Sequence, residues 1–88
     1  MPRPLRKKEK LLQRRLAETE ERIASGERQI AQQRKSIAML EANGHSASHA
    51  KYLLAGMELL QSARRRSRDL LLEQLAGVNR AAGRQASP

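Results

Sequence analysis

The chain of 88 residues contains no cysteine, no phenylalanine and no tryptophan, and Tyr52 is its one aromatic residue. Without cysteine, neither a disulfide bond nor a thiolate metal site is available to stabilise the fold. Aromatic side chains usually dominate the core of a small domain. Their scarcity therefore favours one small domain built by packing of long helices and stabilised by self-association.

Long apolar runs are also missing. No segment approaches the roughly 18 consecutive apolar residues that a membrane-spanning helix needs, and the basic N-terminus is not followed by the apolar segment of a signal peptide. The lack of cysteine is compatible with a reducing compartment. We therefore expect a soluble, cytoplasmic protein.

Residue sets typical of enzymes are absent as well. The sequence has no glycine-rich phosphate loop, no supported Ser-His-Asp set and no pair of carboxylates that a pocket would bring together. His45 and His49 have a spacing that can hold a metal on a helix, but no cysteine and few carboxylates lie nearby to complete such a site. We read them as polar turn residues, and we expect no catalysis, no cofactor, no metal and no small-molecule substrate.

The residues that organise the chain repeat every seven positions, and they are Leu16, Ile23, Ile30 and Ile37. A seven-residue apolar repeat keeps one stripe of a helix against the same partner, as in a coiled coil. An alanine follows each of the four, which would widen the stripe and let another helix approach. The intervening core positions are Leu12, Thr19, Gly26, Gln33 and Leu40, so this half of the stripe is mostly small or polar.

The end of this first helix is marked by Asn43-Gly44, because glycine just past the last periodic residue favours a left-handed terminator. Ser46 is then placed to cap a second helix, with Ser48 as the alternative cap. A connection this short makes the two helices antiparallel neighbours. Folding the chain here places Gly26 opposite Ala63, where we expect a close approach of the two helices.

We expect the following order along the chain. A disordered lead contains Pro2 and Pro4, and a disordered tail of small and polar residues follows the second helix. The predicted bounds are 1–4 for the lead, 5–42 for the first helix, 43–46 for the turn, 47–76 for the second helix and 77–88 for the tail.

The second helix has a broad apolar surface. Leu53, Met57, Leu60, Leu71 and Leu75 follow the 3–4 spacing of an amphipathic helix. Further leucines at 54, 59, 70 and 72 would remain exposed in a single hairpin, and such surfaces usually find partners. The sequence therefore predicts an all-α, antiparallel two-helix hairpin that assembles into a four-helix bundle. The predicted interaction face consists of Leu16, Ile23, Ile30, Ile37, Leu53, Met57, Leu60 and Leu71.

The net charge of +9 is distributed unevenly, with +6 in residues 1–15, −1 in residues 16–42 and +4 in residues 43–88. Such asymmetry indicates an anionic partner, either nucleic acid or a membrane surface. Alternatively, the charge is a solvated surface, with the run at 64–68 paired to Glu20 and Glu21. The candidate anion-binding residues are Arg6, Lys7, Lys10, Arg14, Arg64, Arg65, Arg66 and Arg68.

Residues 26 to about 71 resemble a group of short, uncharacterised bacterial proteins that form helical hairpins. The resemblance rests on Gly26-Glu27-Arg28, Ile30-Ala31, Gln33, Ile37-Ala38, Leu40-Glu41, Gly44-His45, Ala50, Leu53-Leu54, Glu58 and Arg68-Asp69. An Asp-Thr pair commonly follows the Gly-His in that group, and Ser46-Ala47 stands here. The resemblance covers about half of the chain and implies a fold, without an activity.

Two functions from different classes follow. The first is a non-enzymatic interaction or oligomerisation module, which acts through the Ile/Ala face on a second copy of the chain or on another helical protein. The alternative is an electrostatic binder of nucleic acid or of an anionic membrane surface. Without aromatic residues for base stacking, such binding would be salt-sensitive and indifferent to base sequence.

Overall fold

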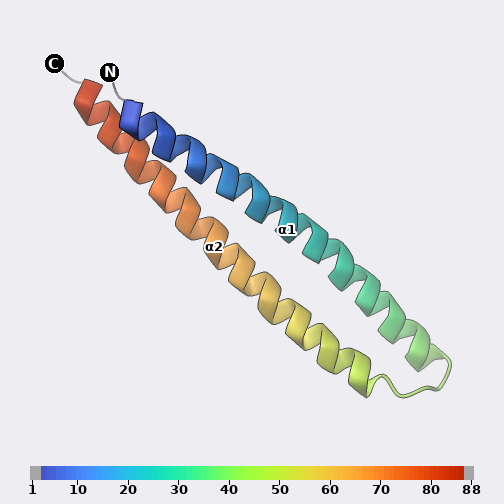
Figure 1. Cartoon of the computed structure of the whole chain (residues 1–88). Helices are drawn as coiled ribbons and strands as arrows, with labels where there is room; N and C mark the ends of the chain where they lie inside the picture. Colours follow the sequence, from blue (N-terminus) through green and yellow to red (C-terminus); the bar gives the residue numbers. More distant parts are fainter. Residues whose placement is uncertain (1–2, 87–88) are drawn as a thin grey trace.

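The computed structural model describes residues 3–86, with the side chains of residues 7–81. It consists of two helices, α1 (Arg3–Ala42) and α2 (Ser48–Ala86), which pack against each other as an antiparallel hairpin. Both chain ends lie at one end of a rod, and the turn lies at the other end (Figure 1). The rod measures 71 × 14 × 14 Å. The predicted all-α hairpin is confirmed.

The first helix begins two residues before the predicted start. Pro4 lies in its first turn, where the N–H that proline lacks would have no helical partner in any case. The expected lead is therefore helical from Arg3, and residues 1–2 lie outside the described part of the chain.

The prediction of a disordered tail is wrong for residues 77–86, which continue α2. Val78 is the reason, because it is buried in a cluster with Leu12 and Leu75 and so extends the contact with α1. Residues 87–88 lie outside the described residues.

Gly44 ends α1 as predicted, with a left-handed φ of 75°. The His45 N–H donates to the Leu40 carbonyl at 2.8 Å, and the Gly44 N–H donates to the Glu41 carbonyl at 3.1 Å. This pair of bonds satisfies two of the carbonyls that a helix end leaves without partners. The chain can therefore reverse direction at this point without leaving those carbonyls unbonded.

Ser46 contributes to the start of α2, but one residue further out than a cap. Its Oγ accepts the Ser48 N–H at 3.4 Å, whereas the carbonyl of the buried Ala47 accepts the first helical bond, from the Lys51 N–H at 2.8 Å. Ala47 thus occupies the cap position. Its methyl group is buried and fills the contact between the helices at the turn.

Along the hairpin, the interhelical seam consists of residues spaced alternately by three and four. On α1 these residues are the predicted heptad positions, which are buried or half-buried from Leu12 to Leu40. The alanines that follow the heptad residues, at 17, 24, 31 and 38, are exposed and lie outside the seam. The stripe is therefore narrower than we expected, and α2 covers it alone.

The face that α2 presents to α1 differs from the predicted one. Leu53 and Leu60 are 46% and 52% exposed, while Leu54 is half-buried and Gln61 is buried. Relative to our prediction, the helix is rotated about its own axis, and its contact with α1 follows the 3–4 frame through Gln61 from Ala47 to Val78. On α2 the seam comprises Ala47, Ala50, Leu54, Met57, Gln61, Arg64, Arg68, Leu71, Leu75 and Val78.

Candidate interaction surface

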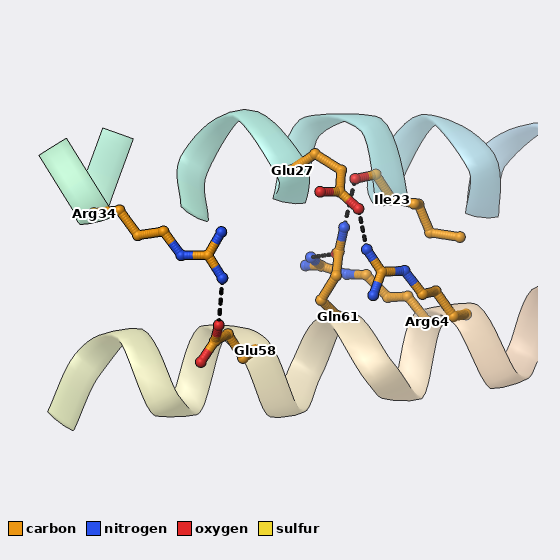
Figure 2. Close-up of polar contacts among 7 residues, drawn as sticks. Ile23, Glu27, Arg34, Glu58, Gln61 and Arg64 are labelled. Atoms are coloured by element: carbon orange, nitrogen blue, oxygen red, sulfur yellow. Dashed lines mark hydrogen bonds and ion pairs between the residues drawn. The ribbon is translucent and has the colours of Figure 1, made fainter. Parts of the chain in front are cut away.

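The middle of the seam is polar and centres on Gln61, whose side chain is 1% exposed. Figure 2 shows this side chain extending from α2 to α1, where its Nε2 donates to the Ile23 carbonyl at 2.7 Å. Its Oε1 accepts a hydrogen bond from Arg64 Nη1 at 3.1 Å. Burial of an amide is costly unless it is hydrogen-bonded, and here both of its ends have partners.

Gly26 provides the space for this amide. A Cβ atom added at Gly26 would lie 2.8 Å from Gln61 Cδ and would overlap Gln61 Oε1. The missing side chain at Gly26 therefore makes room for a side chain of α2, and not for the close approach of its backbone at Ala63 that we expected. The Gln61 side chain fills the site, whereas Ala63, which we expected there, is exposed.

Apolar contacts lie on both sides of this polar middle. At the end that carries the termini, Leu12, Leu75 and Val78 form a buried cluster against which Leu16 and Leu71 pack. Toward the turn, Ile30, Ile37 and Ala47 are buried. A second amide also crosses the seam there, since Gln33 Nε2 donates to the Ala50 carbonyl at 3.0 Å. The hairpin thus has two apolar segments separated by a polar one.

Ion pairs close one side of the seam, which we call the paired flank. Glu41 pairs with Lys51 at 2.7 Å, Arg34 pairs with Glu58 at 2.7 Å, and Glu27 pairs with Arg65. The three pairs recur every seven residues along each helix, and the sign of the charge on α1 alternates (Figure 2 shows Arg34 with Glu58).

The alternation of charge specifies the register of the two helices. A shift of one heptad would place Arg34 opposite Lys51 or Arg65, and it would place Glu58 opposite Glu27 or Glu41. Exposed ion pairs contribute only about 0–1 kcal/mol each to stability. Their main effect is to disfavour the shifted arrangements, in which every pair would be repulsive.

The pKa of the Glu27 carboxyl group is lowered by its contacts with α2. The hydrogen bond from Arg65 lowers the pKa of this carboxyl below its ordinary value of 4.5, and a further hydrogen bond from Gln61 acts in the same direction. Ionised Glu27 is thus coupled both to the paired flank and to the buried amide.

The candidate anion-binding residues fall into two groups. On α1, Lys7, Lys10 and Arg14 are exposed, and the side chain of Arg6 lies outside the described part of the chain. On α2, three of the four arginines have partners within the hairpin, while Arg66 is exposed.

Those partners differ from the expected ones. Arg65 pairs with Glu27 and Arg68 pairs with Asp69, so the proposed pairing with Glu20 and Glu21 is wrong. The cause is the rotation of α2, which brings Arg65 to the paired flank. The stems of Arg64 and Arg68 are half-buried in the seam, as long charged side chains allow when their charged groups reach water.

The opposite side of the seam, which we call the open flank, has a different character. In the part of the chain that the structure describes, no hydrogen bond or ion pair links α1 to α2 along it. Its α2 residues follow a second 3–4 repeat just outside the seam. They include Leu53, Gly56, Leu60, Ala63, Ser67 and Leu70, all of them exposed.

Two apolar grooves lie on the open flank, one toward each end of the rod. The groove near the termini has a volume of about 430 Å³ and is lined by residues that include Leu11, Val78, Lys8 and Arg15. The groove near the turn, of about 360 Å³, is lined by residues that include Met39. By contrast, the groove on the paired flank, of about 290 Å³, is lined mainly by charged side chains.

The two histidines do not share a helix. His45 lies in the turn and His49 lies in the first turn of α2, and both are exposed. Within residues 3–86 no group of three or more His, Cys, Asp or Glu side chains is placed to hold a metal ion. Neither helix in that range contains a stretch long and apolar enough to cross a membrane.

Three features were not predicted from the sequence. They are the burial of Gln61, the hydrogen bond of Gln33 across the seam and the paired flank. The available signal was the strict 3–4 frame from Ala47 to Val78, which passes through three polar residues. Those residues look like an interruption of the pattern until they are set against the small and polar positions of α1.

Comparison of the chain with protein-family models, with curated proteins and with solved structures finds no match.

We predict that Gly26→Ala destabilises the hairpin by about 1–3 kcal/mol, because the new methyl group displaces the Gln61 amide from its partners. In a Gln61→Ala background the same change should instead stabilise by up to about 1 kcal/mol, through the higher helix propensity of alanine. Urea unfolding followed by circular dichroism gives both values. A Gly26→Ala effect that is equal in the two backgrounds would contradict the packing of Gln61 on Gly26.

We also predict that Arg65→Gln raises the pKa of Glu27 toward its ordinary value, whereas Arg66→Gln, with the same loss of charge, leaves it low. Because the folded-state pKa is depressed, the Glu27 contact stabilises the hairpin above the ordinary value of 4.5. Its contribution is lost as the pH falls through the lowered pKa. NMR titration of the Glu27 carboxyl carbon measures this shift. Equal effects of the two substitutions would rule out the specific pairing.

Proposed function

We propose that this chain is a non-enzymatic helical interaction module, and that its docking surface is the open flank. Ile30 and Ile37 of the predicted interaction face are buried against α2, so they are not accessible to a partner. The exposed leucines of α2 are accessible. Leu53, Leu60 and Leu70 lie on one 3–4 repeat of the kind that another helix requires, its other positions being small residues, and no part of α1 covers these leucines.

The observation that carries this proposal is the contrast between the two flanks. Ion pairs satisfy the paired flank internally, whereas the open flank presents leucines, small residues and two apolar grooves. An exposed apolar stripe of this kind marks an interaction site. Small-molecule sites are typically enclosed and carry converging polar groups, whereas these grooves are apolar and lie along a rod. A cytoplasmic location suits this role, since a chain without cysteine needs no oxidising compartment.

The test compares leucine substitutions on the two flanks. We predict that Leu53→Gln/Leu60→Gln reduces capture of helical partners, including other copies of the chain, by roughly tenfold or more, because both side chains lie on the docking surface. Leu72→Gln is the control, since Leu72 is as exposed as Leu53, at 46%, but lies on the paired flank. Quantitative co-precipitation with the immobilised full chain measures the effect. Equal losses with both variants would refute the assignment of the open flank.

A second candidate function, electrostatic binding of polyanions, is favoured by the distribution of charge along the folded rod. Residues 3–15 carry seven basic residues and Glu9, while residues 74–86 carry Arg80 and Arg84 without an acidic residue. The hairpin brings these segments to the same end of the rod, so that this basic end has a net charge of +8. The rest of the chain, including the run at 64–68, has a net charge of only +1.

For this second function we predict that Lys7→Gln/Lys8→Gln/Lys10→Gln lowers the salt slope of duplex DNA binding by about 2–3, at about 0.9 per phosphate contact. The matched control, Arg28→Gln/Lys35→Gln/Arg66→Gln, removes the same charge from exposed sites far from the basic end. Fluorescence anisotropy over a range of salt concentrations gives the slope, and flotation with anionic vesicles tests the membrane alternative. Identical slopes for the two triple variants would exclude the basic end as the binding site.

A further inference from the structure

We infer that a second copy of this chain occupies the open flank, in antiparallel orientation, to form a four-helix rod with a twofold axis near its middle. This inference rests on the proposed function and names the partner for the same surface. Three observations carry it, namely the excess surface of the single hairpin, the order of residues on the stripe and the distribution of charge.

The first observation is the surface that a single hairpin leaves exposed. Its accessible surface is 6,853 Å², whereas a globular monomer of 9.9 kDa is expected to expose about 5,200 Å². One flank of a rod 71 Å long, about 10 Å wide, offers roughly 700 Å² per chain. A pair of such flanks would bury about 1,400 Å² in total, which is within the range of stable protein–protein interfaces.

The second observation is the order of large and small residues on α2. When two rods lie antiparallel with the twofold axis beside Arg65, two residues from the midpoint of α2, residues equidistant from Arg65 meet across the axis. Leu60 then lies beside Leu70 of the second copy, and Leu53 lies over its Gly77. Ala63 and Ser67 meet at the centre, where small side chains let the two α2 helices approach closely. Large side chains therefore face small ones or each other, as interhelical packing requires.

The third observation selects the antiparallel orientation over the parallel one. A parallel pair would place two basic ends, each with a charge of +8, side by side within about one Debye length. In the antiparallel pair each basic end lies beside the turn end of the second copy, where residues 31–58 have a net charge of only +1. Because both chains are positive overall, added salt should strengthen this association, in contrast to binding of a polyanion.

The experiment uses single-cysteine variants of the full chain, which has no cysteine of its own. In the antiparallel dimer, Ser67→Cys lies within about 6 Å of its twin along the axis, and Leu53→Cys is separated from its twin by about 36 Å. Ser62→Cys lies within about 9 Å of its twin along the axis but away from the open flank. We expect Ser67→Cys alone to form a disulfide-linked dimer under mild oxidation. Sedimentation equilibrium at tens of micromolar should show a dimer that Leu53→Gln/Leu60→Gln weakens by roughly tenfold or more and Leu72→Gln does not.

The inference is overturned by a monomer under these conditions, by equal cross-linking of Ser62→Cys and Ser67→Cys, or by cross-linking of Leu53→Cys to itself. These failures remain distinct from failure of the proposed function. A monomer that still captures a different helical protein through Leu53 and Leu60 would keep the function and remove the self-docking. Circular dichroism verifies that each variant is helical, and the cysteine pattern stands independently of the leucine variants.

Discussion

The need of one buried amide for hydrogen-bond partners constrains the rest of this hairpin. Gln61 lies in the seam with almost no exposure, and it can lie there only because Gly26 has no side chain. Buried polar groups contribute little to net stability, but they discriminate strongly against arrangements in which they lose their partners. The Gln61–Gly26 contact therefore selects both the register of the helices and the rotation of α2.

That rotation decides which surfaces remain available. With Gln61 in the seam, the acidic and basic residues at seven-residue spacing meet on the paired flank, and Glu27 bonds to Arg65. The leucines one position away, Leu53 and Leu60, turn outward onto the open flank. An interface between helices that is partly polar thus leaves apolar side chains on the outside, and this is the physical basis of the proposed docking surface.

The sequence was sufficient to predict the two helices, the Gly44 terminator and the heptad of α1, because these features depend on local conformation and on a regular period. It was insufficient for the face of α2, since two frames one residue apart both contain leucines. Only the fit of α2 to Thr19, Gly26 and Gln33 across the seam decides which of the two frames faces α1. That fit depends on both helices together, so the pattern of α2 alone does not reveal it. The extension of α2 past residue 76 has the same origin, because Val78 is buried only through contact with α1.

The most direct test of this account is the NMR behaviour of the Gln61 side-chain amide. If Gln61 fills the space at Gly26 and donates to the Ile23 carbonyl, its Nε2 protons should exchange slowly with solvent. They should also show nuclear Overhauser effects to the Gly26 Hα protons. The side-chain amide of Gln32, which is exposed on α1, provides the rate for an unprotected group. Exchange of the Gln61 amide as fast as that of Gln32, without contacts to Gly26, would contradict the account.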